Sequence, residues 1–311
     1  ILCLIFILPR LMPGGPITAI YGDAVVEMGP ELERELVERY GLDLSVGEQF
    51  LVYLGNMARG DLGYSFYFRA PVSTVLLESL PWTLLLAGTS LIFSAAIGIT
   101  WGTEAGWRRG QRFDRSSLLA ALFLSGIPAF LLGILLLLGF GFYGNLFPIS
   151  GGTSPFPSYS GLAAVLDILH HLFLPALTLT LAQLPRNFLL MRGTFLGTAN
   201  EPYVLTARGK GLKERLIRYR HCLRSALPPV VTRIGMSIGL LFTGVLFVEV
   251  VFAYPGLGHL FYLALQYHDY PTLHGGLLLI TVCVLFFNLL ADLISMKLDP
   301  RLKEDAHKLL G

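Results

Sequence analysis

The sequence predicts an all-α integral membrane protein, and three observations support this fold class. Hydrophobic residues make up 54% of the 311-residue chain and charged residues only 14%, against about 25% charged in an average soluble domain. The apolar residues gather in runs of the ~20 residues that a membrane-spanning helix needs. Lys and Arg are concentrated in alternate segments between these runs, as in proteins whose basic loops stay in the cytosol.

Five complete spans are predicted, each a helix, because at this length only a helix satisfies its own backbone hydrogen bonds in lipid. In chain order they are residues 82–102, 118–143, 172–191, 236–254 and 275–296. Residues 1–12 are also apolar, but as a helix they would extend only ~18 Å, too short for a ~30 Å hydrocarbon core. We interpret them as part of a first span, which brings the predicted count to six. A signal-peptide remnant is the alternative, although it lacks a basic leading end and a small-residue cleavage site.

The charged residues between the spans predict the orientation of the chain. Lys and Arg dominate the segment after the first complete span, the long segment at 192–235 and the C-terminal tail, whereas residues 13–81 are rich in Asp and Glu. Because basic loops remain in the cytosol, we predict that both termini are cytosolic. The predicted organisation is a partial first span at 1–12, an extracytoplasmic helical segment at 13–81, a transmembrane core at 82–297 and a cytosolic tail at 298–311.

A basic stretch compatible with a short helix lies between the third and fourth complete spans. Asn200 is predicted to be its N-cap, Pro202 suits its first turn, and Gly209 and Gly211 are predicted to end it. A helix of ~10 residues is not stable alone, so we expect it to dock on a partner surface. An interfacial helix resting on anionic headgroups is the alternative. The side chains available for docking include Tyr203, Leu205, Leu212, Arg208 and Lys210.

The sequence contains no nucleophile triad, no paired catalytic carboxylates and no phosphate-binding loop. Gly209-Lys210-Gly211 lacks both the upstream glycine and the following Ser or Thr of such a loop. Charged residues inside spans are instead candidates for a translocation path, and these are Glu249, Arg186 and Asp292. The alternatives are structural: Arg186 and Asp292 reach the interface or pair to hold helices together, and Glu249 fixes the turn that follows it.

Metal binding is a further chemistry to weigh, because several histidines fall in the predicted external segments and imidazole binds nickel well. Adjacent His170 and His171 point to different faces of a helix, so interfacial histidines are the favoured interpretation. The three cysteines have no CxxC or Cys/His spacing, so neither a disulfide framework nor a zinc site is predicted.

Short motifs extend along almost the whole chain in the order that one family shows. They include Leu11-Met12-Pro13-Gly14-Gly15-Pro16, Gly60-Asp61-Leu62-Gly63-Tyr64-Ser65, Thr206-Ala207-Arg208-Gly209-Lys210-Gly211-Leu212, Tyr254-Pro255-Gly256-Leu257-Gly258 and Asp269-Tyr270-Pro271. With them the sequence resembles the membrane-spanning permease subunits of ATP-binding-cassette (ABC) importers, in the branch that imports peptides, nickel and some oligosaccharides. The resemblance implies the six-helix permease fold of type I ABC importers.

The resemblance also implies a coupling helix near residues 201–212, which would sit in a groove of a cytosolic ATPase subunit. The glutamate that opens this signature in importers at large would fall near Leu205, so no salt bridge from it is carried over. The residues implied in coupling to the ATPase are Glu201, Tyr203, Leu205, Ala207, Arg208, Lys210, Gly211 and Leu212.

The partners implied are a second, homologous permease subunit, two cytosolic ATPase subunits, an extracytoplasmic solute-binding protein and the lipid of a prokaryotic inner membrane, with no nucleic acid. ATP and magnesium would be bound by the ATPase subunits, leaving this chain without cofactor, metal or catalytic residues. Short peptides are the expected cargo, taken up by alternating access, with nickel or an oligosaccharide as the alternative. A stand-alone secondary transporter would need inverted repeats and interrupted helices, and an intramembrane enzyme would need a catalytic constellation; neither is evident.

Overall fold

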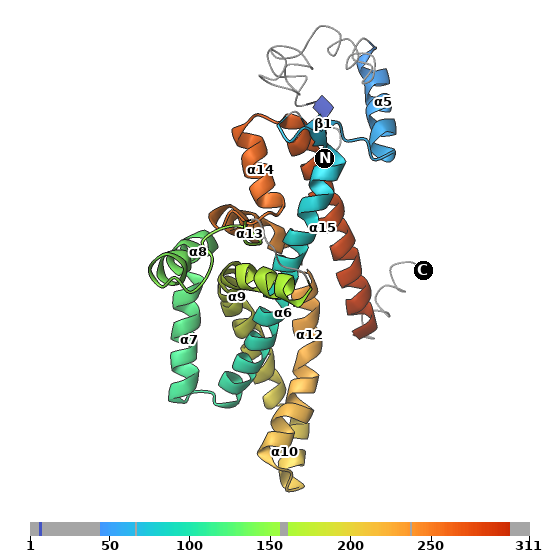
Figure 1. The fold of residues 1–311 in the computed structure, drawn as a ribbon. Coiled ribbons are helices and arrows are strands. Elements are labelled where there is room, and N and C mark those ends of the chain that lie inside the picture. The colour runs from blue at the N-terminus through green and yellow to red at the C-terminus, as the bar shows by residue number, and fades with distance from the viewer. Residues whose placement is uncertain (1–5, 8–43, 66, 156–160, 237, 299–311) are drawn as a thin grey trace, which may run out of the picture. The chain divides into compact units, whose positions relative to one another are not determined.

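The protein is described by a computed structural model that places residues 6–7, 44–65, 67–155, 161–236 and 238–298 (Figure 1). Apart from one short hairpin, the regular elements of this described part are helices, as the sequence predicts. The chain divides into two compact units: Ile1–Leu84 with Tyr254–Val282, and Leu85–Ala253 with Cys283–Gly311. Most of the predicted first span, the external segment up to residue 43 and the tail at 299–311 lie outside the described residues.

The first unit contains the described part of the predicted external segment. Helix α5 (Val46–Ala58) begins with a capping box, in which the Glu48 carboxylate accepts the backbone N–H of Ser45 at 3.0 Å. Strands β1 (Tyr64–Ser65) and β2 (Ala70–Pro71) form an antiparallel hairpin that leads into α6 (Val72–Trp107). Helices α14 (Leu257–Gln266) and α15 (Tyr270–Leu298) follow later in the chain.

A buried polar cluster, the Asp269 cluster (Ser65, Asp269 and Thr272), ties the hairpin to the start of α15. One carboxylate oxygen of Asp269, Oδ2, accepts hydrogen bonds from the hydroxyls of Ser65, at 2.5 Å, and Thr272, at 2.7 Å. Burial raises the pKa of the Asp269 carboxyl, and these hydrogen bonds oppose the rise. The cluster joins two of the sequence motifs, which lie about 200 residues apart in the chain.

The second unit is organised around α9 (Leu162–Ala199), which contacts α7 (Arg112–Ser125), α8 (Ala129–Leu136), α12 (Leu223–Met236) and α13 (Ile238–Val251). The second half of α6 approaches α9 along three glycines spaced four residues apart, Gly98, Gly102 and Gly106. A Cβ at Gly98 would lie 2.6 Å from Asn187 Cβ, and one at Gly102 would lie 2.8 Å from the Phe188 carbonyl oxygen. Glycine is therefore needed at these two positions for the helices to pack this closely.

By length and composition, three described helices can cross a membrane: α6, α9 and α15 as far as Leu290. They correspond to the predicted spans at 82–102, 172–191 and 275–296. The predicted span at 236–254 contains α13. Among the described residues the candidate spans number three, or four if one bent helix pair counts as a single span. The predicted count of six is therefore not confirmed.

The prediction of one helix over residues 118–143 is wrong, because this segment is bent by 97° between α7 and α8. Helix α7 ends at the C-cap Gly126, and Pro128 is the N-cap of α8. Proline has no N–H to continue the α7 hydrogen-bond ladder and disfavours helical backbone at the residue before it. After the bend, α8 continues into a π-helix, η1 (Leu137–Tyr143).

Candidate functional site

The basic stretch forms a short helix, α10 (Pro202–Gly209), at one end of the second unit (Figure 1). Pro202 occupies its first turn as predicted, and Gly211, with φ of +72°, follows its end. The predicted N-cap is wrong: Glu201 is the N-cap, and Asn200 is the C-cap of α9. The reason is that α9 continues to Ala199, so Asn200 keeps helical backbone angles and its side-chain amide donates to the Leu196 carbonyl oxygen at 3.0 Å.

One face of α10 is packed on its own chain. Val204 and Ala207 are buried in a hydrophobic cluster built from α9, α10, the π-helix η2 (Ile217–Cys222) and α12. Leu212, predicted to contact a partner, is partly buried against this same cluster. The short helix is therefore held by tertiary packing, which supplies the stability that its length cannot.

The other face of α10 is uncovered and partly apolar. Leu205 is 68% exposed and Tyr203 is 38% exposed, although both are large apolar side chains. Glu201, Arg208 and Lys210 are also exposed. Exposed apolar side chains rimmed by charges are typical of a protein–protein contact, so this face has the composition of a docking surface.

Arg208 is braced by two contacts that hold the end of α10 in place. Its Nε pairs with Glu214 Oε1 at 3.1 Å, and its guanidinium carbon lies 5.4 Å from the centroid of the Trp107 ring. Arg218 also contacts Trp107, with its guanidinium carbon 5.0 Å from the centroid. Trp107 is the last residue of α6, so α10 and η2 are both linked to the end of that long helix by cation–π contacts.

Glu104 lies one turn before Trp107 on α6, and its carboxylate contacts three side chains. Its carboxylate accepts hydrogen bonds from Arg218 Nη1 at 2.6 Å and from the Tyr219 hydroxyl, and it pairs with Arg108 at 3.2 Å. The hydrogen bond to Glu104 raises the pKa of the Tyr219 hydroxyl. We name the set Glu104, Trp107, Arg208, Arg218 and Tyr219 the Glu104–Trp107 cluster. Sequence reasoning missed it, and the only local signal was the i,i+4 spacing of Glu104 and Arg108.

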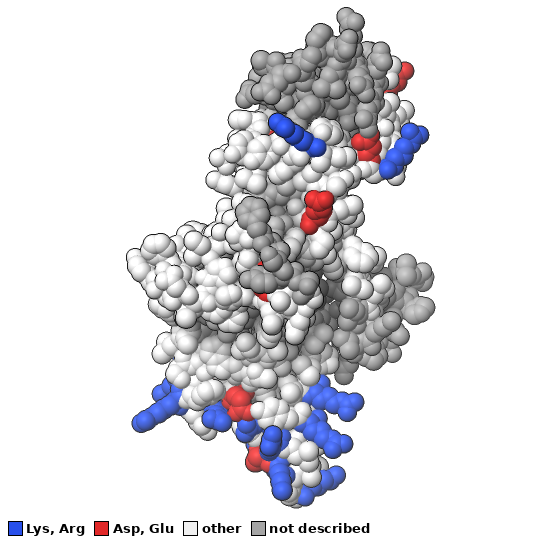
Figure 2. Space-filling view, in the orientation of Figure 1, with Lys and Arg blue, Asp and Glu red and all other residues white. Residues whose placement is uncertain are grey.

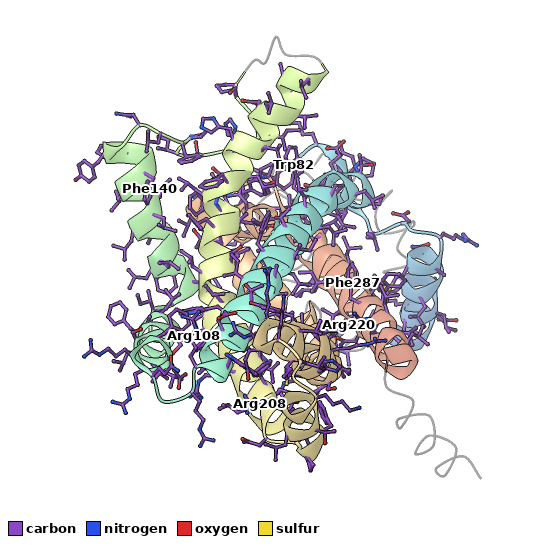
Figure 3. The ribbon with its side chains drawn as sticks, turned by 90° about the horizontal axis from the view of Figure 1, so that it is seen from below. Trp82, Arg108, Phe140, Arg208, Arg220 and Phe287 are labelled. Atoms are coloured by element: carbon purple, nitrogen blue, oxygen red, sulfur yellow. The ribbon has the colours of Figure 1, made fainter. Side chains whose placement is uncertain are left out.

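The first turn of α7 is held to α9 by a bidentate ion pair. Arg192 Nε and Nη2 lie 2.6 and 2.8 Å from the two carboxylate oxygens of Asp114, which also accepts the Gly110 N–H at 2.9 Å. Exposed Lys and Arg side chains from the turn between α6 and α7, from α10 and from η2 gather over the same end of the second unit (Figure 2). Figure 3 views the structure from that end and labels Arg108, Arg208 and Arg220 from these three segments.

Of the three residues predicted for a translocation path, the structure describes the surroundings of two side chains. Glu249 is fully buried in α13, and Arg186 is exposed on α9. Asp292 lies in α15, but its side chain is outside the described residues. The two described side chains differ in burial, and a shared role of the three residues stays a prediction.

The adjacent histidines are engaged separately. His170 Nε2 lies 2.9 Å from the Leu146 carbonyl oxygen, and His171 Nδ1 lies 2.9 Å from the Asp167 carbonyl oxygen. Within the described ranges, no group of three or more His, Cys, Asp or Glu side chains is placed to hold a metal ion.

Comparison with known proteins identifies the class. Residues 94–304 match the family described as the binding-protein-dependent transport system inner membrane component. The match covers more than half of the chain, and the chain belongs to this family. The resemblance to ABC importer permeases inferred from the sequence motifs is thereby confirmed.

Individual relatives cover nearly the whole chain. A protein of Brucella suis, provisionally named a peptide permease, is 38% identical over 301 residues, which is 96% of this chain and 93% of the relative. The dipeptide transport system permease protein of Escherichia coli is 32% identical over 317 residues, with the same two coverages. A solved inward-facing structure of the MetNI methionine ABC transporter matches with a TM-score of 0.56 at 20% identity, over 72% of this chain and 96% of that chain. This last match shows the fold, that of a type I importer permease.

Proposed function

We propose that this chain is the permease subunit of an ATP-driven importer that carries short peptides into the cell by alternating access. Support for the cargo comes from the names of its relatives, a peptide permease in Brucella suis and a dipeptide permease in Escherichia coli. Family membership supports an inner-membrane location and a solute-binding protein as the delivering partner. The chain works beside a second permease subunit, and two ATPase subunits bind ATP and magnesium and hydrolyse the nucleotide.

We further propose that α10 is the helix through which ATPase subunits act on this chain, and that it faces the cytosol with the basic loops. One observation carries this assignment: α10 is anchored on one face by Val204 and Ala207 and leaves Tyr203 and Leu205 uncovered on the other. A helix built in this way transmits force, because it is rigid toward its own chain and still offers apolar area to a partner.

The Glu104–Trp107 cluster supplies the path from α10 to the spanning part of the chain. Arg208 on α10 and Arg218 on η2 both contact Trp107, and Glu104 holds Arg218 and Tyr219. A displacement of α10 is therefore passed to α6 through charged and aromatic contacts, which can exchange between two arrangements as alternating access requires.

Leu205→Glu tests this assignment in the assembled transporter. The exposed side chain makes little contact with its own chain, so we expect normal insertion and thermal stability but at least a tenfold loss of ATPase subunits that co-purify in detergent. Arg115→Gln is the matched control, since it changes the net charge by the same amount at an exposed position outside α10. Full retention of the ATPase subunits by the Leu205→Glu variant would remove the proposed role of α10.

A further inference from the structure

A groove of about 400 Å³ lies beside α10 in the second unit. It is lined by Lys213, Arg215, Leu216, Tyr219 and Arg220, which come from α11 (Glu214–Leu216), its N-cap and η2. The groove lies at the end of the unit over which Lys and Arg gather (Figures 2 and 3).

The three cationic side chains of the groove differ from the arginines around them. Arg108, Arg192, Arg208 and Arg218 each pair with a carboxylate. Over the described part of the chain, Lys213, Arg215 and Arg220 form no ion pair. No described carboxylate therefore compensates the three positive charges around this groove, and the complementary ligand is an anion that offers several acceptor oxygens.

The groove also has an apolar component. The Leu216 side chain and the Tyr219 ring are 37% and 40% exposed, and the Tyr219 hydroxyl is turned to Glu104. A fully hydrated inorganic anion would leave this apolar area uncovered. A ligand with a phosphate head and an apolar body would satisfy both components.

The groove lies close to the end of the predicted span in α6, where a lipid headgroup would be found. Tyr219 bonds to Glu104, which follows the predicted span at 82–102 by two residues, or ~3 Å of helix rise. Trp107 lies one turn further along α6. Aromatic and basic side chains at the end of an apolar span are typical of the membrane–water interface, where basic pockets take the headgroups of anionic lipids.

We propose that this groove binds the headgroup phosphate of an anionic phospholipid, with Lys213, Arg215 and Arg220 as the cationic partners and Leu216 and Tyr219 against the glycerol and upper acyl chain. The bound lipid is a fixed part of the surface next to α10. The site needs neither the solute nor the ATPase subunits and so is independent of the proposed transport function.

The test measures retained lipid by native mass spectrometry of the purified transporter, equilibrated with phosphatidylglycerol or phosphatidylcholine. The variant is Lys213→Gln with Arg215→Gln and Arg220→Gln. We expect about a fivefold loss of phosphatidylglycerol affinity for each cation, the equivalent of about 1 kcal/mol, and therefore about 100-fold for the triple variant. Phosphatidylcholine should bind weakly to both forms.

The matched control is Arg109→Gln with Arg112→Gln and Arg115→Gln, which removes the same charge from exposed arginines of the same end of the unit. This control should retain phosphatidylglycerol within twofold of wild type. Equal losses in the two triple variants would show a general charge effect and overturn the site. Thermal unfolding of both variants in detergent shows whether each still folds.

Two further experiments distinguish a bound lipid from other ligands of the groove. Inorganic phosphate at 100-fold excess should displace little phosphatidylglycerol, because it lacks the apolar body, and full displacement would assign the groove to free phosphate. Amine labelling of Lys213 in the assembled transporter should be slower with phosphatidylglycerol than with phosphatidylcholine. Equal protection with the two lipids would assign the groove to a protein partner and overturn the proposal.

Discussion

The Glu104–Trp107 cluster and the Asp269 cluster are both polar, but they are built for different tasks. The Asp269 cluster is buried, and one carboxylate oxygen accepts two short hydroxyl hydrogen bonds. The Glu104–Trp107 cluster lies at the surface, with the Arg208 side chain 47% and the Glu104 side chain 22% exposed. It combines ion pairs, hydrogen bonds and cation–π contacts that water can partly replace.

This difference separates a fixed element from a movable one. Opening the Asp269 cluster would leave buried hydroxyls without acceptors, which costs about 1–3 kcal/mol for each group. The contact of α10 with α6 is the cation–π contact of half-exposed Arg208 with Trp107, and opening such a contact at an exposed site costs about 0.5–1 kcal/mol. We infer that the hairpin and the start of α15 move as one piece, whereas the contact of α10 with α6 is the place where a small free energy shifts an equilibrium.

The largest effect on stability is expected for Asp269→Ala. The change leaves the Ser65 and Thr272 hydroxyls without their shared acceptor, so the free energy of unfolding should fall by about 2–4 kcal/mol. Asp269→Asn is the matched control, because its amide oxygen can accept both hydrogen bonds. Thermal unfolding in detergent should rank the Ala variant well below the Asn variant, and equal midpoints would show that the hydrogen bonds contribute nothing.

The next effect is on coupling and is expected for Glu104→Gln combined with Trp107→Leu. Because these contacts are partly exposed, the unfolding midpoint should fall only slightly, by the equivalent of about 1–2 kcal/mol. The number of solute molecules transported for each ATP hydrolysed should fall at least fivefold in reconstituted vesicles. An unchanged ratio would mean that α10 acts on the spans by another route. Leu119→Met, at a 69% exposed position on α7, is a control that should leave the ratio unchanged.

The fold and the position of α10 could be predicted from the sequence, because hydropathy, charge and turn residues are local signals. The bend at Pro128 was missed, although the run Gly126-Ile127-Pro128 interrupts the apolar segment and is a local signal for it. The four-residue spacing of Gly98, Gly102 and Gly106 is typical of close helix packing, but the sequence analysis did not predict that contact.

The two polar clusters could not be predicted in the same way. Glu104 and Arg218 are 114 residues apart, and Ser65 and Asp269 are 204 apart. Nothing local at these positions indicates the partner, because each contact depends on how α6, η2 and the hairpin pack. The assignment of Leu212 to a partner surface missed its packing against the α10 core for the same reason: the period of a helix shows which residues share a face but not what covers that face.

The Asp269 carboxyl should also make stability depend on pH in a predictable direction. Burial raises its pKa in the folded state above the ordinary value of 3.8, so over the interval between the two values the folded chain binds more protons than the unfolded chain. Stability therefore falls as pH rises through this interval. The slope of the unfolding midpoint against pH, measured from pH 4 upward, should be smaller in Asp269→Asn than in wild type. Parallel slopes would show that Asp269 does not titrate differently on folding.

The smallest effect is expected for the exposed pair of Arg208 and Glu214. Both side chains are about half exposed, so Glu214→Gln should change the free energy of unfolding by less than about 1 kcal/mol. The cation–π contact of Arg208 with Trp107 survives this change, whereas Arg208→Gln removes both contacts. If the Trp107 contact orients α10, transport for each ATP should fall in Arg208→Gln and stay near wild type in Glu214→Gln. Equal losses in the two variants would show that the ion pair with Glu214, and not the Trp107 ring, orients α10. Within the Glu104–Trp107 cluster, only the contacts of Glu104 would then distinguish it from the Asp269 cluster.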